Sequence, residues 1–120
     1  MMNATTLPRI LHIEDNQDIK AFVFSILQDI ASISHASSLA TAEEKLSSEQ
    51  FDLVILDLVL PDGSGLDLIR EIKSLDPPVA IIVHSAHELS DTMSGVDAVL
   101  SKLHTTEDDL RELVQKLTTT

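Results

Sequence analysis

Five chemically active side chains stand at or just after short apolar runs of this 120-residue chain. They are three carboxylates, a hydroxyl and an ammonium group, namely Glu14, Asp15, Asp57, Ser85 and Lys102. Three carboxylates held close together repel one another and cannot all stay ionised unless a cation joins them. Ligands that offer only oxygen favour a hard ion, above all Mg²⁺. A carboxylate is also a nucleophile toward phosphorus, and an ammonium and a hydroxyl can bind phosphoryl oxygens.

The apolar runs that precede these side chains predict the strands of a parallel sheet. Residues 51–58 (FDLVILDL) are apolar on both faces, which is typical of a parallel strand covered by helices on both sides. The other predicted strands are residues 9–14, 32–37, 79–86 and 97–102. Open parallel sheets bind their ligands at the carboxyl ends of the strands. We therefore expect the five side chains to share one rim of the sheet.

Apolar residues recur at helical spacing between the predicted strands. The spacing of three, four and seven predicts a helix over residues 18–30. Further helices are predicted over residues 39–49, 66–75 and 105–117, with a loop at 61–65. Pro77-Pro78 stops the third helix, and Thr105 or Thr106 begins the last in a pattern close to a capping box. The alternation predicts an α/β fold, a doubly wound five-stranded parallel sheet with helices on both faces.

Composition limits the function classes that the chain can serve. The length suits one domain, with residues 1–8 as a tail and 9–118 as the domain. The absence of cysteine excludes disulfides, thiolate metal sites and cysteine nucleophiles. The net charge of -12 argues against direct binding of nucleic acid or of an anionic membrane. No apolar stretch approaches the length of a membrane span, so we expect a cytoplasmic protein.

Together these residues resemble the receiver domain of two-component response regulators, the CheY-like family. The matching elements are Glu14-Asp15 after the first strand, Ser85-Ala86 after the fourth and Lys102 after the fifth. The third strand leads into the pattern Asp57-x-x-x-Pro61-x-x-x-Gly65. The match covers nearly the whole chain in the right order. It implies a flavodoxin-like sheet with the strand order 2-1-3-4-5.

The resemblance also implies a role for each side chain. Asp57 would accept a phosphoryl group from a phosphohistidine on a histidine kinase or histidine phosphotransfer protein. Mg²⁺ would be held by Asp15, Asp57 and the backbone carbonyl of Val59, with Glu14 acting directly or through water. Ser85 and Lys102 would hold the phosphoryl oxygens and couple phosphorylation to a shape change, which a downstream protein or output domain reads. Such a domain catalyses only its own phosphorylation and dephosphorylation.

Three features depart from the family pattern. Leu103 follows the lysine where proline is usual, and a cis bond there would cost roughly 3 kcal/mol. Val99 stands where the family carries a switching aromatic residue. Only residues 86–101 separate Ser85 from Lys102, several fewer than usual. We therefore expect a fourth helix within residues 87–96 that is short or displaced, with phosphate reception intact and signal output remodelled.

Other functions fit the sequence less well. A pseudo-receiver, acting as a phosphorylation-independent interaction module, is the alternative that the three departures keep open. A phosphatase of the haloacid-dehalogenase type would need an acid at Val59 and a cap insertion. A dinucleotide-binding domain would need a Gly-x-Gly-x-x-Gly motif after the first strand.

Two further groups of residues have alternative interpretations. His12 and His84 fall in predicted buried strands, where we expect hydrogen-bonded core residues rather than metal ligands. Phe24 lies off the centre of the apolar stripe of the first helix. With Gln17 and Lys20 it forms either part of a kinase-docking face or the edge of the core.

Overall fold

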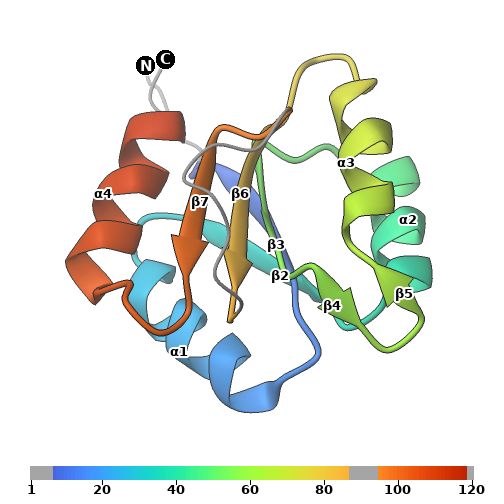
Figure 1. Ribbon diagram of the computed structural model, residues 1–120. Coiled ribbons are helices and arrows are strands. Elements are labelled where there is room, and N and C mark those ends of the chain that lie inside the picture. Colours follow the sequence, from blue (N-terminus) through green and yellow to red (C-terminus); the bar gives the residue numbers. More distant parts are fainter. Residues whose placement is uncertain (1–6, 87–94, 119–120) are drawn as a thin grey trace, which may run out of the picture.

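Five parallel strands form the central sheet of the computed structural model, which describes residues 7–86 and 95–118. The strands are β1 (Arg9–Ile13), β2 (Ser32–Ala36), β3 (Leu53–Leu56), β6 (Ala80–Ser85) and β7 (Ala98–Ser101). They pair in the order β2-β1-β3-β6-β7, and every pairing is parallel (Figure 1). The predicted fold class and strand order are therefore confirmed, with β3 at the centre of the sheet.

Helices cover both faces of this sheet. The helices α1 (Gln17–Leu27) and α4 (Glu107–Thr118) lie on one face, and α2 (Leu39–Ser48) and α3 (Leu66–Lys73) lie on the other (Figure 1). Successive strand residues point to opposite faces, so Val54 joins the α2/α3 core while Ile55 joins the α1/α4 core. All four residues of β3 are 0% exposed, and burying each such side chain contributes about 1.5–3 kcal/mol. Two-sided burial explains why this strand shows no polar alternation.

The helix ends follow from local capping. Asn16 begins α1, because its side-chain oxygen accepts a hydrogen bond of 3.0 Å from the Ile19 amide. Thr106 and Asp109 exchange two side-chain-to-backbone hydrogen bonds of 3.1 Å at the start of α4. This is the predicted capping box, with Thr106 as its first residue.

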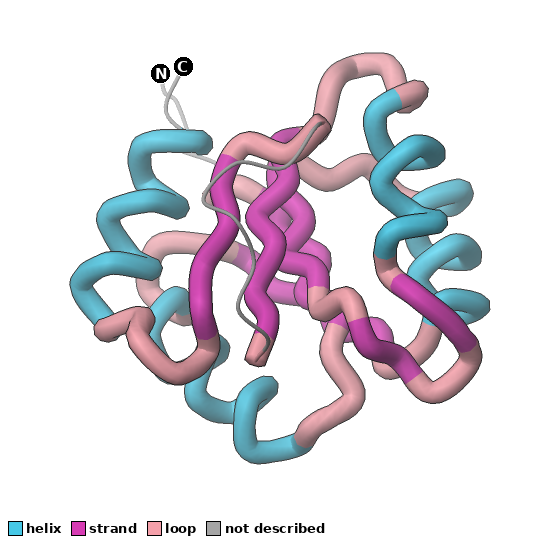
Figure 2. The backbone as a smooth tube through the Cα atoms, in the orientation of Figure 1, coloured by secondary structure: helices cyan, strands magenta, loops and turns pink. Residues whose placement is uncertain are grey.

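The segment expected as a loop at residues 61–65 supplies the turn and the second strand of a short hairpin. Strands β4 (Val59–Leu60) and β5 (Gly63–Ser64) pair antiparallel across the Pro61-Asp62 turn. Figure 2 shows this hairpin as a separate pair of strands beside the central sheet. A ladder of two residue pairs is too short to leave a period-two pattern in the sequence, so the expectation of a plain loop was wrong.

Two expectations concern the segment before β7 and the loop after it. The short fourth helix falls mainly on residues 87–94, which lie outside the described residues. Among the described residues the single cis peptide bond joins Asp76 to Pro77, so the Lys102–Leu103 bond is trans. Within residues 7–86 and 95–118, no helix has the length and apolar character needed to cross a bilayer.

Candidate functional site

The carboxyl ends of four strands bring the predicted site residues to one rim. Backbone hydrogen bonds continue the strand ladders there, from the Glu14 amide to the Ala36 carbonyl and from the Asp57 amide to the Ile13 carbonyl, at 2.9 and 3.0 Å. The Lys102 amide donates to the Ser85 carbonyl at 2.8 Å. These bonds fix the main chain of the rim, so the side chains start from defined positions.

Three carboxylates gather at this rim. Glu14, Asp15 and Asp57 each offer an oxygen atom, and these oxygens all lie within 4.8 Å of one another. Glu14 and Asp57 are 1% and 6% exposed, whereas Asp15 is exposed to solvent. A set of closely spaced carboxylate oxygens with one open side fits a hard divalent cation such as Mg²⁺. The residues present therefore suit the implied metal ion.

Lys102 lies between two of these carboxylates. Its Nζ is 2.6 Å from Glu14 Oε1 and 3.2 Å from Asp57 Oδ2. Burial raises the pKa of Glu14, although the ammonium of Lys102 opposes that shift. Partial burial also opposes the charge on Lys102, but the contacts with Glu14 and Asp57 raise its pKa overall. One ammonium beside three carboxylates leaves a negative site that attracts a second cation.

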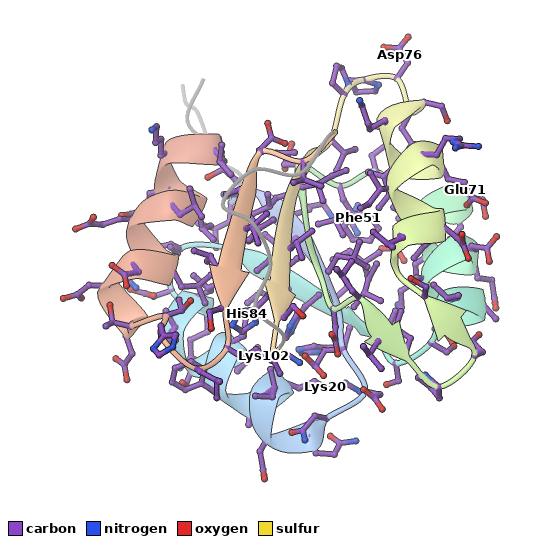
Figure 3. The ribbon with its side chains drawn as sticks, in the orientation of Figure 1. Lys20, Phe51, Glu71, Asp76, His84 and Lys102 are labelled. Carbon is purple, nitrogen blue, oxygen red and sulfur yellow. The ribbon has the colours of Figure 1, made fainter. Side chains whose placement is uncertain are left out.

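A cavity of about 380 Å³ opens over the rim. It is lined by Glu14, Asp15, Asn16, Asp57, Val59, Leu60, Pro61, Ala86 and Lys102. Ser85 lies beside this lining with 1% of its surface exposed, and its backbone joins it to Lys102. Figure 3 shows Lys102 and His84 near the carboxyl ends of β6 and β7. The structure thus gathers the carboxylates, Val59 and Lys102 around the cavity and leaves Ser85 buried at its edge.

The chain after Asp57 folds back tightly over the acceptor. The Val59 amide donates to Asp57 Oδ1 at 3.2 Å, and the Gly65 amide donates to the Leu58 carbonyl at 2.8 Å. A Cβ at position 65 would lie 2.5 Å from the Asp57 carbonyl oxygen, closer than real Cβ atoms approach. Glycine is therefore required at the end of the Asp57-x-x-x-Pro61-x-x-x-Gly65 pattern because the backbones come so close.

The comparison with known families agrees with this geometry. A model of the response regulator receiver domain matches residues 10–116, which is most of the chain. The chain belongs to this family. As a response regulator receiver domain it is a regulatory module of two-component systems rather than a metabolic enzyme.

Among curated relatives, the receiver domain is similar to the KDP operon transcriptional regulatory protein KdpE of Escherichia coli (strain K12). The two are 31% identical over 93 residues, which are 77% of this chain and 41% of KdpE. The chain thus spans less than half of the length of KdpE.

Two solved structures share the fold closely. The signal receiver domain of a putative Luxo repressor protein from Vibrio parahaemolyticus is 28% identical with a TM-score of 0.84, covering 93% of this chain and 90% of that one. The response regulator protein TrrA from Thermotoga maritima was solved in complex with Mg(2+)-BeF. It is 33% identical with a TM-score of 0.82, covering 92% of this chain and 99% of that one.

The receiver domain also carries a histidine layer beneath the rim, defined as His12, His35 and His84. Each lies two residues after an isoleucine of the α1/α4 core, at positions 10, 33 and 82, so all three rings point to that face. His12 pairs with His35 in the β1–β2 register, with ring centroids 5.7 Å apart. Sequence reasoning missed this layer because its members are far apart along the chain.

Burial keeps the two inner rings of the histidine layer neutral. His12 and His84 are 1% and 2% exposed, as the sequence predicted, but Nδ1 of each has no hydrogen-bond partner in the described part of the chain. Burial, with the nearby His35 and His84, lowers the pKa of His12 to about 3. Burial and the charge of Lys102 lower the pKa of His84 to about 4. Protonation of either ring in the folded protein is therefore unfavourable.

Proposed function

We propose that this receiver domain takes a phosphoryl group from a phosphohistidine onto Asp57 in a Mg²⁺-dependent reaction, and signals by changing conformation. The observation that carries the proposal is the placement of the Asp57 carboxylate. It lies at the end of a strand that is buried on both faces, within 4.8 Å of oxygens of Glu14 and Asp15 and 3.2 Å from Lys102 Nζ. A nucleophile on a rigid strand presents its oxygen at a defined point, which favours in-line transfer.

The transfer needs no cofactor besides the metal ion. An Asp57 carboxylate oxygen forms a bond to phosphorus while the bond between phosphorus and the imidazole nitrogen breaks. The bonding electron pair leaves with the imidazole, and the product is an aspartyl phosphate. Asp15, Asp57 and the Val59 carbonyl would hold the Mg²⁺, with Glu14 binding directly or through water. When bound, the ion neutralises charge on the phosphoryl oxygens.

Lys102 and Ser85 supply the remaining contacts with the phosphoryl group. Lys102 Nζ already reaches Asp57 Oδ2, so a small movement brings it to a phosphoryl oxygen. We assign the Ser85 hydroxyl to a second oxygen. The Lys102 amide bonds to the Ser85 carbonyl, so a movement of either residue affects the other. That coupling is the proposed start of the conformational change that a downstream protein or an output domain reads.

A histidine kinase or histidine phosphotransfer protein is the proposed donor. Exposed apolar side chains support a docking face on α1 and the β7–α4 loop. Phe22 and Phe24 are 38% and 43% exposed on α1, and Leu103, next to Lys102, is 72% exposed. The Phe24 ring also lies 6.3 Å from the His35 ring, so Phe24 belongs to the β2 side of that helix. Phe22 is thus the better candidate for direct contact with the donor.

Intact-mass measurement tests the proposal. The protein and its Asp57→Asn variant are incubated with phosphoramidate, with and without Mg²⁺. We expect the wild type to gain the mass of one phosphoryl group only with Mg²⁺, and the variant to gain none. A wild type that is folded by circular dichroism and gains no mass would overturn the proposal. The domain would then serve as a phosphorylation-independent interaction module, the pseudo-receiver alternative.

A further inference from the structure

The β4–β5 hairpin that follows the acceptor is hydrogen-bonded at its turn to the N-terminus of α2. Asp62 Oδ1 accepts a hydrogen bond of 2.8 Å from the Leu39 amide, and Asp62 Oδ2 accepts one of 3.1 Å from the Ala40 amide. These are the first two amides of α2, which have no partner inside the helix. Their hydrogen bonds lower the pKa of Asp62, so the carboxylate is charged at neutral pH.

Packing adds to this tie. At Gly63, directly after Asp62, a Cβ would lie 2.7 Å from Leu39 Cδ1, so the hairpin touches the first residue of α2. Gly63 has a φ of 150°, a backbone conformation that other residues rarely adopt. Leu39 in turn packs against the α2/α3 core. The turn is thus anchored to an element that is itself held by buried side chains.

The other end of the hairpin enters the functional site. Val59 pairs with Ser64 across the hairpin, and the Val59 amide donates to Asp57 Oδ1 at 3.2 Å. The Gly65 amide closes the hairpin onto the Leu58 carbonyl at 2.8 Å. The main chain of Val59 therefore depends on where the hairpin lies. Its amide contacts the acceptor, and its carbonyl belongs to the proposed metal ligands.

We propose that Asp62 is a positioning residue for this site. By holding the hairpin against α2, it sets the Val59 main chain at the position required by the metal ion and by the acceptor. The inference rests on the proposed function for its consequence, but the positioning itself concerns only contacts within this chain. Groups that orient metal ligands typically change metal affinity by 10–100-fold when removed, which makes the effect measurable.

Two matched variants separate positioning from helix capping. Asp62→Ala removes the tie between hairpin and helix. Ser38→Ala removes the other cap of α2, the hydrogen bond from the Thr41 amide to Ser38 Oγ, and leaves the hairpin untouched. Both variants are expected to speed hydrogen exchange in the first turn of α2. Only Asp62→Ala is expected to speed exchange of the Val59 and Gly65 amides in the metal-free protein.

Calorimetric titration with MgCl₂ gives the second measurement. We expect Asp62→Ala to weaken Mg²⁺ binding about tenfold and Ser38→Ala to leave it unchanged. Equal exchange rates of the Val59 and Gly65 amides in the two variants would overturn the inference. If the wild type binds Mg²⁺, equal Mg²⁺ affinities of the two variants would overturn it as well. A wild type that shows no Mg²⁺-dependent phosphorylation would contradict the proposed function instead. The metal-free exchange measurement would still decide the role of Asp62.

Discussion

The two faces of the sheet are built differently, although the same strands supply both. The buried members of the α2/α3 core are leucine, isoleucine, valine, alanine and one phenylalanine. The α1/α4 face carries the histidine layer directly beneath the acidic rim. An aliphatic core has no proton to gain or lose, whereas a buried neutral histidine becomes unfavourable once its ring is protonated. The contribution of the α1/α4 face to the free energy of unfolding should therefore depend on pH, whereas the contribution of the α2/α3 face should not.

The largest expected effect is a loss of stability in acid. Burial lowers the pKa of His12 from 6.5 to about 3 and that of His84 from 6.5 to about 4, so the unfolded state binds more protons between pH 6.5 and 4. The free energy of unfolding should then fall as the pH falls, by on the order of 5 kcal/mol for the two rings together. Urea unfolding at a series of pH values measures this loss.

A double variant isolates the histidine contribution. In His12→Leu/His84→Leu the carboxylates are unchanged, so their own pH dependence cancels in the comparison with the wild type. The variant should lose much less stability between pH 6.5 and 4.5. Parallel pH curves for the two proteins would show that the histidine layer is not the cause.

The aliphatic face should show the opposite behaviour. Leu56 is 0% exposed within the α2/α3 core, and Leu56→Ala would leave a cavity that costs about 3 kcal/mol. Because no titrating group is removed, the cost should be the same at pH 7 and pH 5. A cost that changes strongly over this range would break the contrast between the two faces.

A smaller loss of stability is expected from a substitution at the rim. Lys102→Ala leaves the buried Glu14 beside Asp57 without the ammonium, which should lower the unfolding free energy of the metal-free protein by about 2 kcal/mol at pH 7. This loss is smaller than the loss expected on breaking a fully enclosed ion pair, because the site opens to the cavity. Saturating Mg²⁺ should restore part of the loss. Lys116→Ala, an exposed lysine of α4, is the control and should change little.

The smallest effect is expected at the surface of the α1/α4 face. Arg111 of α4 binds Asp29, just after α1, through two hydrogen bonds of 2.7 and 2.8 Å. The Arg111 guanidinium lowers the pKa of Asp29, but the pair is screened by solvent and salt. Asp29→Asn should move the urea midpoint less than Lys102→Ala does. A larger shift of the urea midpoint would mean that this surface ion pair contributes more than the core beneath it to the packing of α1 against α4.

The sequence predicted the rim well because the rim depends on local patterns. Asp57 and Lys102 each follow a run of residues that forms a strand of the sheet, and parallel strands end at the same edge. The tie from Asp62 to Leu39 could not be predicted, since it joins residues 23 positions apart through backbone amides that have no sequence signature. The histidine layer was missed for a related reason. The pairing of His12 with His35 depends on strand register, which the residue types alone did not give.

The close approach at Gly65 has a consequence for how the domain tolerates change. Any side chain there meets the Asp57 carbonyl oxygen and the Leu58 Cα, which are main-chain atoms and cannot rotate away. In a library of random variants selected only for folded protein, with no demand for phosphoryl transfer, position 65 should still retain glycine. Asp57, by contrast, should accept replacement by residues of similar or smaller size, such as asparagine or alanine, under that selection. A second selection of the same library would require phosphorylation. Deep sequencing after each selection would therefore separate residues needed for the folded structure of the site from residues needed only for phosphoryl transfer.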